Sequence, residues 1–311
     1  MLKAEAENTM YQLIFVATIF LIGWLLQFSG KFSEDAPLTL NQYVIYVALP
    51  ALILAQLPSL AFDETIWKVV FIAWFGLLLG ALLVLALAKL FAWDRQTTGA
   101  LLMLVPLGNT SFVGIPMINA LIGTKGVPIA LIYDQLGSFL GLILYGSWVI
   151  AAFAGKSKPT LMGLSQRILS FPPFWALILA LALPSFWMQN HWHEPLILVG
   201  NTLVPVVLIA LGLQFKCRLP NHHYKPLISG LSLKLVVVPF FVLLLVLIMG
   251  WQGMAIETSM LESAMAPMIS AGALAIAAGL APELVAALVS WGLIISFITV
   301  PIWQIIIKFV L

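Results

Sequence analysis

Long apolar stretches alternate with short polar segments along the whole chain. A helix of about 20 apolar residues crosses the hydrocarbon core of a bilayer. By this measure the pattern predicts ten membrane-spanning helices, at residues 11–28, 38–60, 67–92, 99–122, 127–153, 171–187, 196–215, 225–250, 255–279 and 282–310. A polar linker, residues 154–170, separates the first five spans from the last five. We therefore expect an all-α membrane protein with ten transmembrane helices.

The two halves, residues 1–153 and 171–311, show their prolines in the same order. Matching prolines occur in spans two and seven, four and nine, and five and ten: Pro50 and Pro205, Pro106 and Pro267, Pro128 and Pro282. Because each half has an odd number of spans, the second half enters the membrane from the opposite side. The pattern predicts two inverted five-helix repeats, which are the usual frame of an alternating-access carrier.

The fourth span is interrupted near its middle. Pro106 and Pro116 each remove an amide donor and clash with the carbonyl four residues earlier. Glycines and polar residues lie between them, so we expect the helix to stop and restart. Unpaired backbone in a membrane is tolerated inside protein or along a wet cavity, which makes the break a candidate ligand site. The alternative is a continuous, proline-kinked helix whose Asn109 bonds to a neighbouring helix.

Three ionisable residues fall within predicted spans: Asp134, Glu262 and Lys234. Such residues cost about 2.5–3.5 kcal/mol on insertion scales and mark functional sites by default. We therefore treat Asp134 and Glu262 as candidate functional residues, with Lys234 as a candidate charge partner. The alternatives are that both carboxylates lie at the headgroup level and that Lys234 extends to the membrane surface.

Composition supports the membrane assignment and narrows the functional classes. The chain has 311 residues, of which 62% are hydrophobic and 8% charged, which is not the make-up of a soluble domain. Cys217 is the single cysteine, and all four histidines fall in predicted loops: His191, His193, His222 and His223. We therefore expect no metal site, no cofactor and no nucleic-acid partner. An intramembrane enzyme would need paired aspartates or a Ser/His arrangement within the spans, so we expect no enzyme.

Lysine and arginine counts in the short loops predict the orientation. Four lie on the side of the N-terminus and nine on the other side. Since the cytoplasmic loops carry the excess of positive charge, both termini are expected to be periplasmic or extracellular. The linker at 154–170 is then cytoplasmic.

The run from Asn109 to Pro116, N-T-S-F-V-G-I-P, fits the N-T-x-x-x-G-I-P pattern of the auxin efflux carrier family. This family includes the plant PIN proteins and many bacterial members. The run Ala264-Met265-Ala266-Pro267 and the five-plus-five layout are also similar, and the likeness covers nearly the whole chain. The chain lacks a long loop after span five, which resembles the bacterial members and implies a location in the inner (plasma) membrane of a bacterium.

The resemblance implies a fold shared with bile acid:sodium symporters. Spans 1, 2, 6 and 7 would form a scaffold, spans 3–5 and 8–10 a transport domain, and broken spans 4 and 9 would cross at the midplane. The implied function is elevator-type secondary transport of a small organic anion, either auxin-like or a mono- or dicarboxylate such as malate or malonate. The implied partners are this anion, the lipid bilayer, and a second copy bound through the scaffold spans. An uncoupled facilitator or channel, and a membrane sensor without transport, are the alternatives.

The coupling ion remains open between a proton and sodium. In the sodium symporters, span nine carries an E-x-x-M-Q pattern whose glutamate helps to bind the ion. This chain keeps Glu262 and Met265 but has Ala266 in place of the glutamine. Proton coupling through Glu262 or Asp134 is therefore the main alternative to sodium.

The anion itself is expected at the breaks in spans four and nine. Helix N-termini present unpaired amides and roughly half a positive charge. Two such ends would converge, one near Ser111–Pro116 and the other after Pro267, and could bind a carboxylate without arginine. The candidate substrate-binding residues are Gly108, Asn109, Thr110, Ser111, Met265, Ser270, Ala271 and Gly272, with Pro106, Pro116 and Pro267 as helix breakers.

The orientation is testable by cysteine labelling. A single cysteine placed at position 158, in an otherwise Cys-free variant, should not react with a membrane-impermeant reagent applied from outside, because the linker is expected in the cytoplasm. The same cysteine should react after the membrane is made permeable. Efficient labelling in intact cells would reverse the assigned orientation.

Overall fold

A computed structural model describes residues 2–60, 63–155, 160–182, 192–215 and 224–311. These residues form helices and connecting loops, with one isolated β-bridge. Several sequence-based calls lie outside the described residues: position 158 of the linker, Cys217, His191, His222, His223 and the end of the sixth predicted span.

The chain divides into two compact units. Unit 1 comprises Met1–Phe62, Ile115–Leu131 and Ile168–Phe215, and unit 2 comprises Asp63–Gly114, Ile132–Arg167 and Lys216–Leu311. The first five predicted spans contribute to both units, and so do the last five. A simple division of the chain into a first and a second half therefore does not describe the two units.

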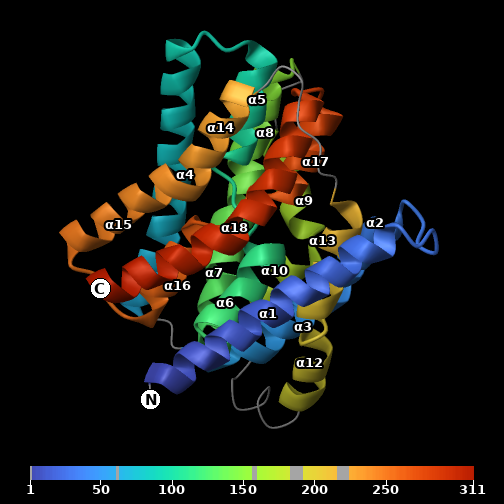
Figure 1. Cartoon of the computed structure of the whole chain (residues 1–311), viewed down its shortest axis with the longest axis vertical. Coiled ribbons are helices and arrows are strands. Elements are labelled where there is room, and N and C mark those ends of the chain that lie inside the picture. Colours follow the sequence, from blue (N-terminus) through green and yellow to red (C-terminus); the bar gives the residue numbers. More distant parts are fainter. Residues whose placement is uncertain (1, 61–62, 156–159, 183–191, 216–223) are drawn as a thin grey trace. The chain divides into compact units, whose positions relative to one another are not determined.

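Unit 1 is built around a close crossing of two helices. Its main helices are α1 (Leu2–Gln27), α2 (Ala36–Tyr43), η1 (Val44–Ala48), α3 (Leu49–Gln56), α6 (Ile115–Leu121), α10 (Pro172–Ala182), α12 (His193–Gly200) and α13 (Leu203–Gln214). Helices α1 and α13 lie against each other (Figure 1). A methyl group at Gly23 would lie 2.5 Å from the carbonyl oxygen of Ile209, so the glycine permits direct backbone contact. Gln27 Nε2 caps the end of α13 by donating to Leu213 O at 2.6 Å.

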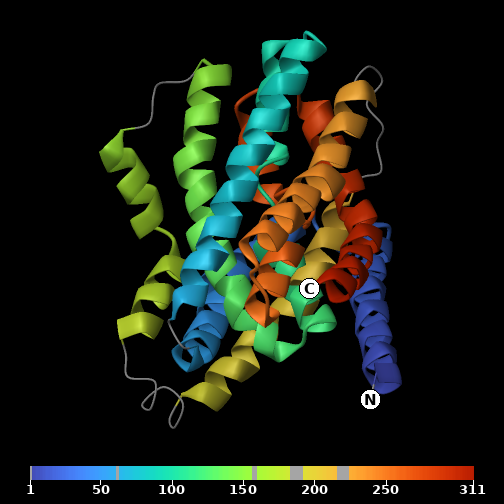
Figure 2. The ribbon, with the colours of Figure 1, turned by 90° about the vertical axis from the view of Figure 1, so that its left-hand side faces the viewer.

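Unit 2 contains the longest helices, α4 (Glu64–Leu90) and α18 (Pro282–Val310). The other elements that its packing depends on are α5 (Arg95–Leu104), η3 (Thr110–Gly114), η5 (Tyr133–Phe139), η6 (Leu142–Gly146), α8 (Ser147–Phe153), α14 (Tyr224–Ser232), η7 (Leu233–Val237), α15 (Val238–Met249), α16 (Met254–Ser263) and α17 (Ile269–Ala277). Helices α4 and α15 run side by side (Figure 2). A buried apolar cluster from α4, α5, η7, α17 and α18 forms the core of this unit.

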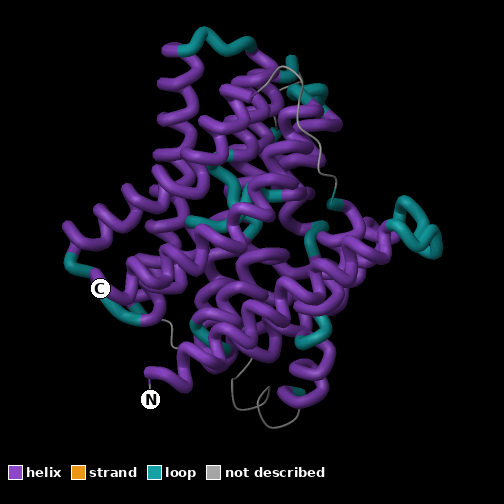
Figure 3. The backbone as a smooth tube through the Cα atoms, in the orientation of Figure 1, coloured by secondary structure: helices purple, strands orange, loops and turns teal. Residues whose placement is uncertain are grey.

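Two helix breaks meet in the middle of unit 2. Helix α5 ends at Leu104 and η3 begins at Thr110, while α16 ends at Ser263 and α17 begins at Ile269. The two intervening segments run antiparallel (Figure 3) and are joined by two backbone hydrogen bonds. Asn109 N donates to Ala266 O at 2.8 Å, and Met268 N donates to Leu107 O at 3.0 Å. The predicted break in the fourth span is thus confirmed, and a continuous kinked helix is excluded. We call this pair of segments, residues 105–109 and 264–268, the crossover.

Seven helices of the described residues are long and apolar enough to cross a membrane, or eight if α9 (Leu161–Leu169) and α10 count as one bent span. The protein is therefore an all-α membrane protein, while the expected count of ten spans stays a prediction. The difference has a physical origin, because the pieces on either side of the crossover are too short to cross alone. Helices α5 and α16 have ten residues each, and α17 has nine.

Each helix break leaves a carbonyl that needs a new partner. Pro106 has no N–H to donate to Leu102 O, and in the structure Tyr145 supplies the missing bond through its hydroxyl at 2.9 Å. Tyr145 belongs to η6, so the bond ties this element to the end of α5.

A side-chain donor also replaces the missing backbone N–H at Pro239, near the start of α15. Leu235 O, four residues earlier, accepts a hydrogen bond from Trp303 Nε1 of α18 at 2.8 Å. Trp303 is buried, so this bond also fixes the side of α18 that faces η7. Aromatic donors from distant elements thus complete the backbone bonding that the prolines interrupt.

Candidate functional site

Four of the polar residues singled out in the sequence lie on π-helical turns of unit 2. Thr110 and Ser111 are in η3, Asp134 is in η5, and Lys234 is in η7. Single π-helical turns within α-helices occur frequently at functional sites. The turns η3 and η7 each end two residues before a proline, Pro116 and Pro239. Proline cannot bond to the carbonyl four residues back, and the wider turn accommodates this loss. The prolines therefore offered a signal for these turns that the sequence analysis did not use.

Asp134 is buried and held by three side-chain donors. It is 2% exposed. Thr110 Oγ1 donates to Asp134 Oδ1 at 2.6 Å, and Ser111 Oγ donates to the same oxygen. Gln135 Nε2 donates to Asp134 Oδ2 at 2.8 Å. The hydroxyls that were expected to bind a substrate anion therefore bind a carboxylate of the chain itself.

Glu262 is fully buried in the last turn of α16. Neither of its carboxylate oxygens has a hydrogen-bond partner within the described structure. The carboxylate lies directly against Gly114, where the Cβ of any other residue would overlap with it. Gly114, the glycine of the N-T-x-x-x-G-I-P run, therefore leaves the space that the Glu262 side chain occupies. Glu262 comes from the other interrupted span.

Lys234 is 3% exposed, so it does not extend to the membrane surface. Its Nζ donates to Ser263 O at 3.3 Å. Pro267 has no N–H for this carbonyl, so the lysine is a third side chain that bonds to a carbonyl four residues before a proline. The ammonium also faces the negative end of the α16 dipole. A Cβ at Gly108 would lie 3.1 Å from Nζ, so a glycine there leaves room for the lysine.

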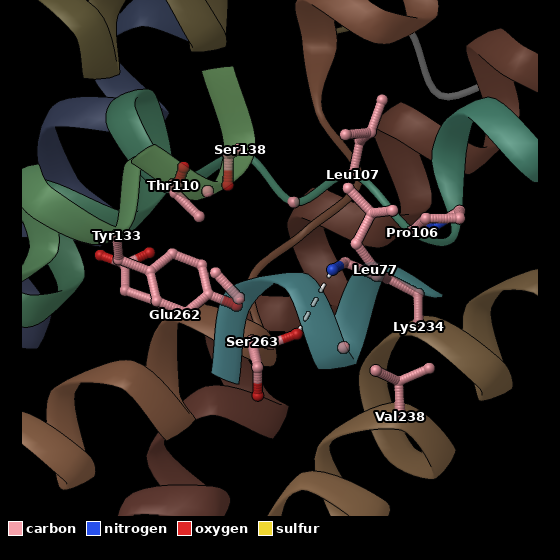
Figure 4. Close-up of a pocket in the computed structure, with 14 residues that line it drawn as sticks. Leu77, Pro106, Leu107, Thr110, Tyr133, Ser138, Lys234, Val238, Glu262 and Ser263 are labelled. Atoms are coloured by element: carbon pink, nitrogen blue, oxygen red, sulfur yellow. Dashed lines mark hydrogen bonds between the residues drawn. The ribbon is translucent and has the colours of Figure 1, made fainter. Parts of the chain in front are cut away.

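A small pocket adjoins these groups (Figure 4). The close-up shows Lys234 pointing to the carbonyl of Ser263, with Thr110, Tyr133 and Ser138 on the opposite side of the pocket. Its volume of about 10 Å³ is room for about one water molecule. In this conformation the pocket is too small for an organic anion. The polar and charged residues that line it are Thr110, Tyr133, Ser138, Lys234, Glu262 and Ser263.

Asn109 has one satisfied and one unsatisfied side-chain atom. Its Oδ1 accepts a hydrogen bond from Phe112 N at 3.2 Å, which stabilises the start of η3. Its Nδ2 is buried and has no partner within the described structure. An unpaired buried donor costs about 1–3 kcal/mol, so a ligand that accepts a bond from Nδ2 would recover this energy.

The remaining candidate residues lie in the crossover, in α17 and in α6. Gly108, Met265 and Pro267 lie in the crossover, where Met265 is fully buried. Ser270, Ala271 and Gly272 form the first turn of α17. Ala271 is buried in the apolar core, and Gly272 packs near Val285 and Val289, so this turn contacts side chains of α18. Pro106 is in the crossover, and Pro116 lies in α6 of unit 1.

Sequence reasoning missed four residues that shape this site. Gln135 and Tyr133 flank Asp134, while Tyr145 and Trp303 supply donors to the proline-freed carbonyls. Tyrosine and tryptophan at the ends of spans usually mark the membrane interface. Their roles as internal donors depend on contacts between distant elements, which one sequence does not display.

These features define the class of protein. Apolar helices of membrane-spanning length, combined with a broken-helix crossover and buried charged residues, are typical of membrane transporters. The comparison with known families gives the same result: the family described as "Membrane transport protein", known as the auxin efflux carrier family, matches residues 8–304, so the chain belongs to this family. The family is one of transporters and not of enzymes.

Two archaeal relatives carry the description "uncharacterized transporter". The one from Methanothermobacter thermautotrophicus is 27% identical over 307 residues, covering 94% of this chain and 96% of the relative. The one from Methanocaldococcus jannaschii is 27% identical over 213 residues, covering 65% of this chain and 67% of the relative. The resemblance inferred from the Asn109–Pro116 run is thereby confirmed.

The close approach of Gly114 and Glu262 is testable by a double-mutant cycle. Gly114→Ala should lower the stability by about 1–3 kcal/mol, because the added methyl group overlaps with the carboxylate. In a Glu262→Ala background the same change should cost much less. Thermal unfolding of the purified protein measures both effects. Gly146→Ala is the control, since its Cβ would meet Leu142 Cδ1 at an ordinary 3.4 Å. Strictly additive effects of the two substitutions would contradict the contact.

Proposed function

We propose that the protein is a secondary carrier of a small organic anion, a mono- or dicarboxylate, which works by alternating access. The observation that carries this proposal is the crossover, which places hydrogen-bond donors and buried charges inside an apolar unit of a transporter. Among the described residues, Asn109 Nδ2 has no hydrogen-bond acceptor, and Lys234 is a buried cation beside the pocket. Together they favour a negatively charged substrate.

The proposal includes the architecture. Ten spans would form two inverted repeats, with unit 1 serving as the scaffold and unit 2 as the moving transport domain of an elevator. Two features support this architecture. The antiparallel pairing of Gly108 with Pro267 joins the broken segment of one half of the chain to the corresponding segment of the other half. The candidate residues other than Pro116 lie in unit 2. Residues 115–131, expected within the transport domain, cluster with unit 1. The first segment of the moving part would then end at Gly114, and the second would begin at Ile132.

The proposal also includes a coupling ion at Glu262. If all three are ionised, Asp134 and Glu262 carry two negative charges and Lys234 one positive charge. Three donors stabilise the Asp134 carboxylate, whereas no hydrogen bond from the described part of the chain stabilises that of Glu262. A buried carboxylate without partners is stable when it binds a proton or a cation. One proton or one sodium ion at Glu262 would therefore balance the charge of the site.

The proposed location combines the orientation expected from the loop charges with the resemblance to the bacterial members of the family. We propose a bacterial plasma membrane with both termini outside, and assembly of two copies through unit 1. The exposed apolar side chains of α1, such as Ile14, Leu21 and Leu25, suit contact with lipid or with a second copy.

Substrate binding is tested by substitution of Asn109. Asn109→Ala should weaken binding of the transported carboxylate at least tenfold, because the loss of one hydrogen bond in a buried site costs about 1–3 kcal/mol. Asn109→Ser is a matched control for folding, since its hydroxyl can still accept the bond from Phe112 N while the Nδ2 donor is lost. Uptake into proteoliposomes from a panel of small carboxylates identifies the substrate and measures the change. Unchanged affinity in both folded variants would place the anion elsewhere.

Coupling is tested separately. Glu262→Gln should abolish uphill transport driven by a pH or sodium gradient, because the amide cannot take up the ion, while exchange of substrate across the membrane persists. Asp134→Asn, measured in parallel, shows which carboxylate couples. Loss of dependence on pH indicates a proton, and loss of dependence on sodium indicates the metal ion. Full gradient-driven accumulation by both variants would overturn ion coupling at this site.

A further inference from the structure

Three donors from two elements converge on one side chain in unit 2. The Thr110 and Ser111 hydroxyls come from η3, directly after the crossover, and the Gln135 amide comes from η5. They bind both oxygens of a single carboxylate, that of Asp134, in a site where Thr110 is fully buried and Gln135 is 1% exposed. We call these three donor groups the carboxylate cradle.

We propose that the carboxylate cradle is the binding subsite for the substrate's carboxylate, and that in this conformation Asp134 occupies it as an internal ligand. The inference rests on the proposed function, since it assumes that the substrate is a carboxylate. It adds that binding is an exchange, in which the carboxylate of the substrate takes the donors that Asp134 leaves.

The chemistry of the donors supports this assignment. Two hydroxyls and an amide N–H₂ can bind any carboxylate of suitable position, and nothing in the set is particular to an aspartate. The adjoining pocket, lined by Thr110 among others, has room for about one water molecule. An anion that reached these donors would therefore have to displace the group that now holds them.

The surroundings of Asp134 bear on such an exchange. Asp134 is at the second residue of η5, a π-helical turn, and its neighbour Gln135 has a buried Oε1 without a partner in the described structure. The ionisable groups that face this region are Tyr133, Glu262 and Lys234. Because exchange brings in one more negative charge, it requires a proton or a cation at Asp134 or Glu262. The exchange would thus link substrate binding to the coupling ion.

Formate tests the cradle because it has the size of the carboxylate that Asp134→Ala removes. In the purified, full-length Asp134→Ala protein, formate should raise the midpoint of thermal unfolding by about 2–4 °C relative to chloride at equal ionic strength. The wild-type protein should show no such difference, because its own carboxylate fills the cradle. The double variants Thr110→Val with Asp134→Ala, and Ser111→Ala with Asp134→Ala, should lose most of the response.

Asp134→Asn keeps the test decisive if the alanine variant does not fold. A neutral amide binds the hydroxyl donors less strongly than a carboxylate. Formate should then shift the unfolding midpoint of the asparagine variant by an amount above that of the wild type. Equal responses to formate and chloride in the folded Asp134 variants, or equal responses to formate in variant and wild type, would overturn the proposal.

The result of the formate experiment can be distinguished from the result of the transport experiments that test the proposed function. The formate experiment reads binding to a variant and needs no transport. If the wild type transports no carboxylate but formate stabilises Asp134→Ala, the proposed substrate class is wrong while the cradle remains a carboxylate site. If carboxylates are transported but formate has no specific effect, the carrier function stands and Asp134 is a structural residue.

Discussion

Backbone pairing at the crossover is the constraint on which unit 2 depends. Breaking two helices inside an apolar unit exposes amides and carbonyls that water cannot reach. The two hydrogen bonds between Asn109 and Ala266 and between Met268 and Leu107 satisfy part of this need. Each broken segment is thus the other's partner, so neither break is tolerable alone. This mutual dependence brings residues more than 150 positions apart into one small site.

The prolines of unit 2 also determine which side chains must lie nearby. The carbonyls of Leu102, Leu235 and Ser263 each lie four residues before a proline. They accept hydrogen bonds from Tyr145, Trp303 and Lys234, respectively. Lys234 is therefore both a structural donor and the positive charge of the site. A structural need and a functional group are thus combined in one residue.

The charged groups differ in how well they are satisfied, and this difference points to the division of roles. Asp134 has three donors and Lys234 a carbonyl acceptor, whereas both oxygens of Glu262 lack a hydrogen-bond partner within the described residues. A fully satisfied group is stable as it is, while an unsatisfied one gains by binding an ion. Glycines complete the arrangement, since Gly114 admits Glu262 and Gly108 admits Lys234. Among these three charged side chains, Glu262 is thus the one without a hydrogen-bond partner in the described part of the chain.

The sequence by itself determined the class of fold, the family and the position of the helix break. Hydrophobic run length, prolines and the Asn109–Pro116 run depend on local chemistry, which one chain displays directly. The tertiary structure decided what the polar residues do. Thr110 and Ser111 suit a substrate anion in sequence, yet they bind Asp134, because η3 and η5 pack together. Gly114 had no assigned role until Glu262 was placed against it. Such pairings depend on how distant segments pack, and therefore only the folded chain could reveal them.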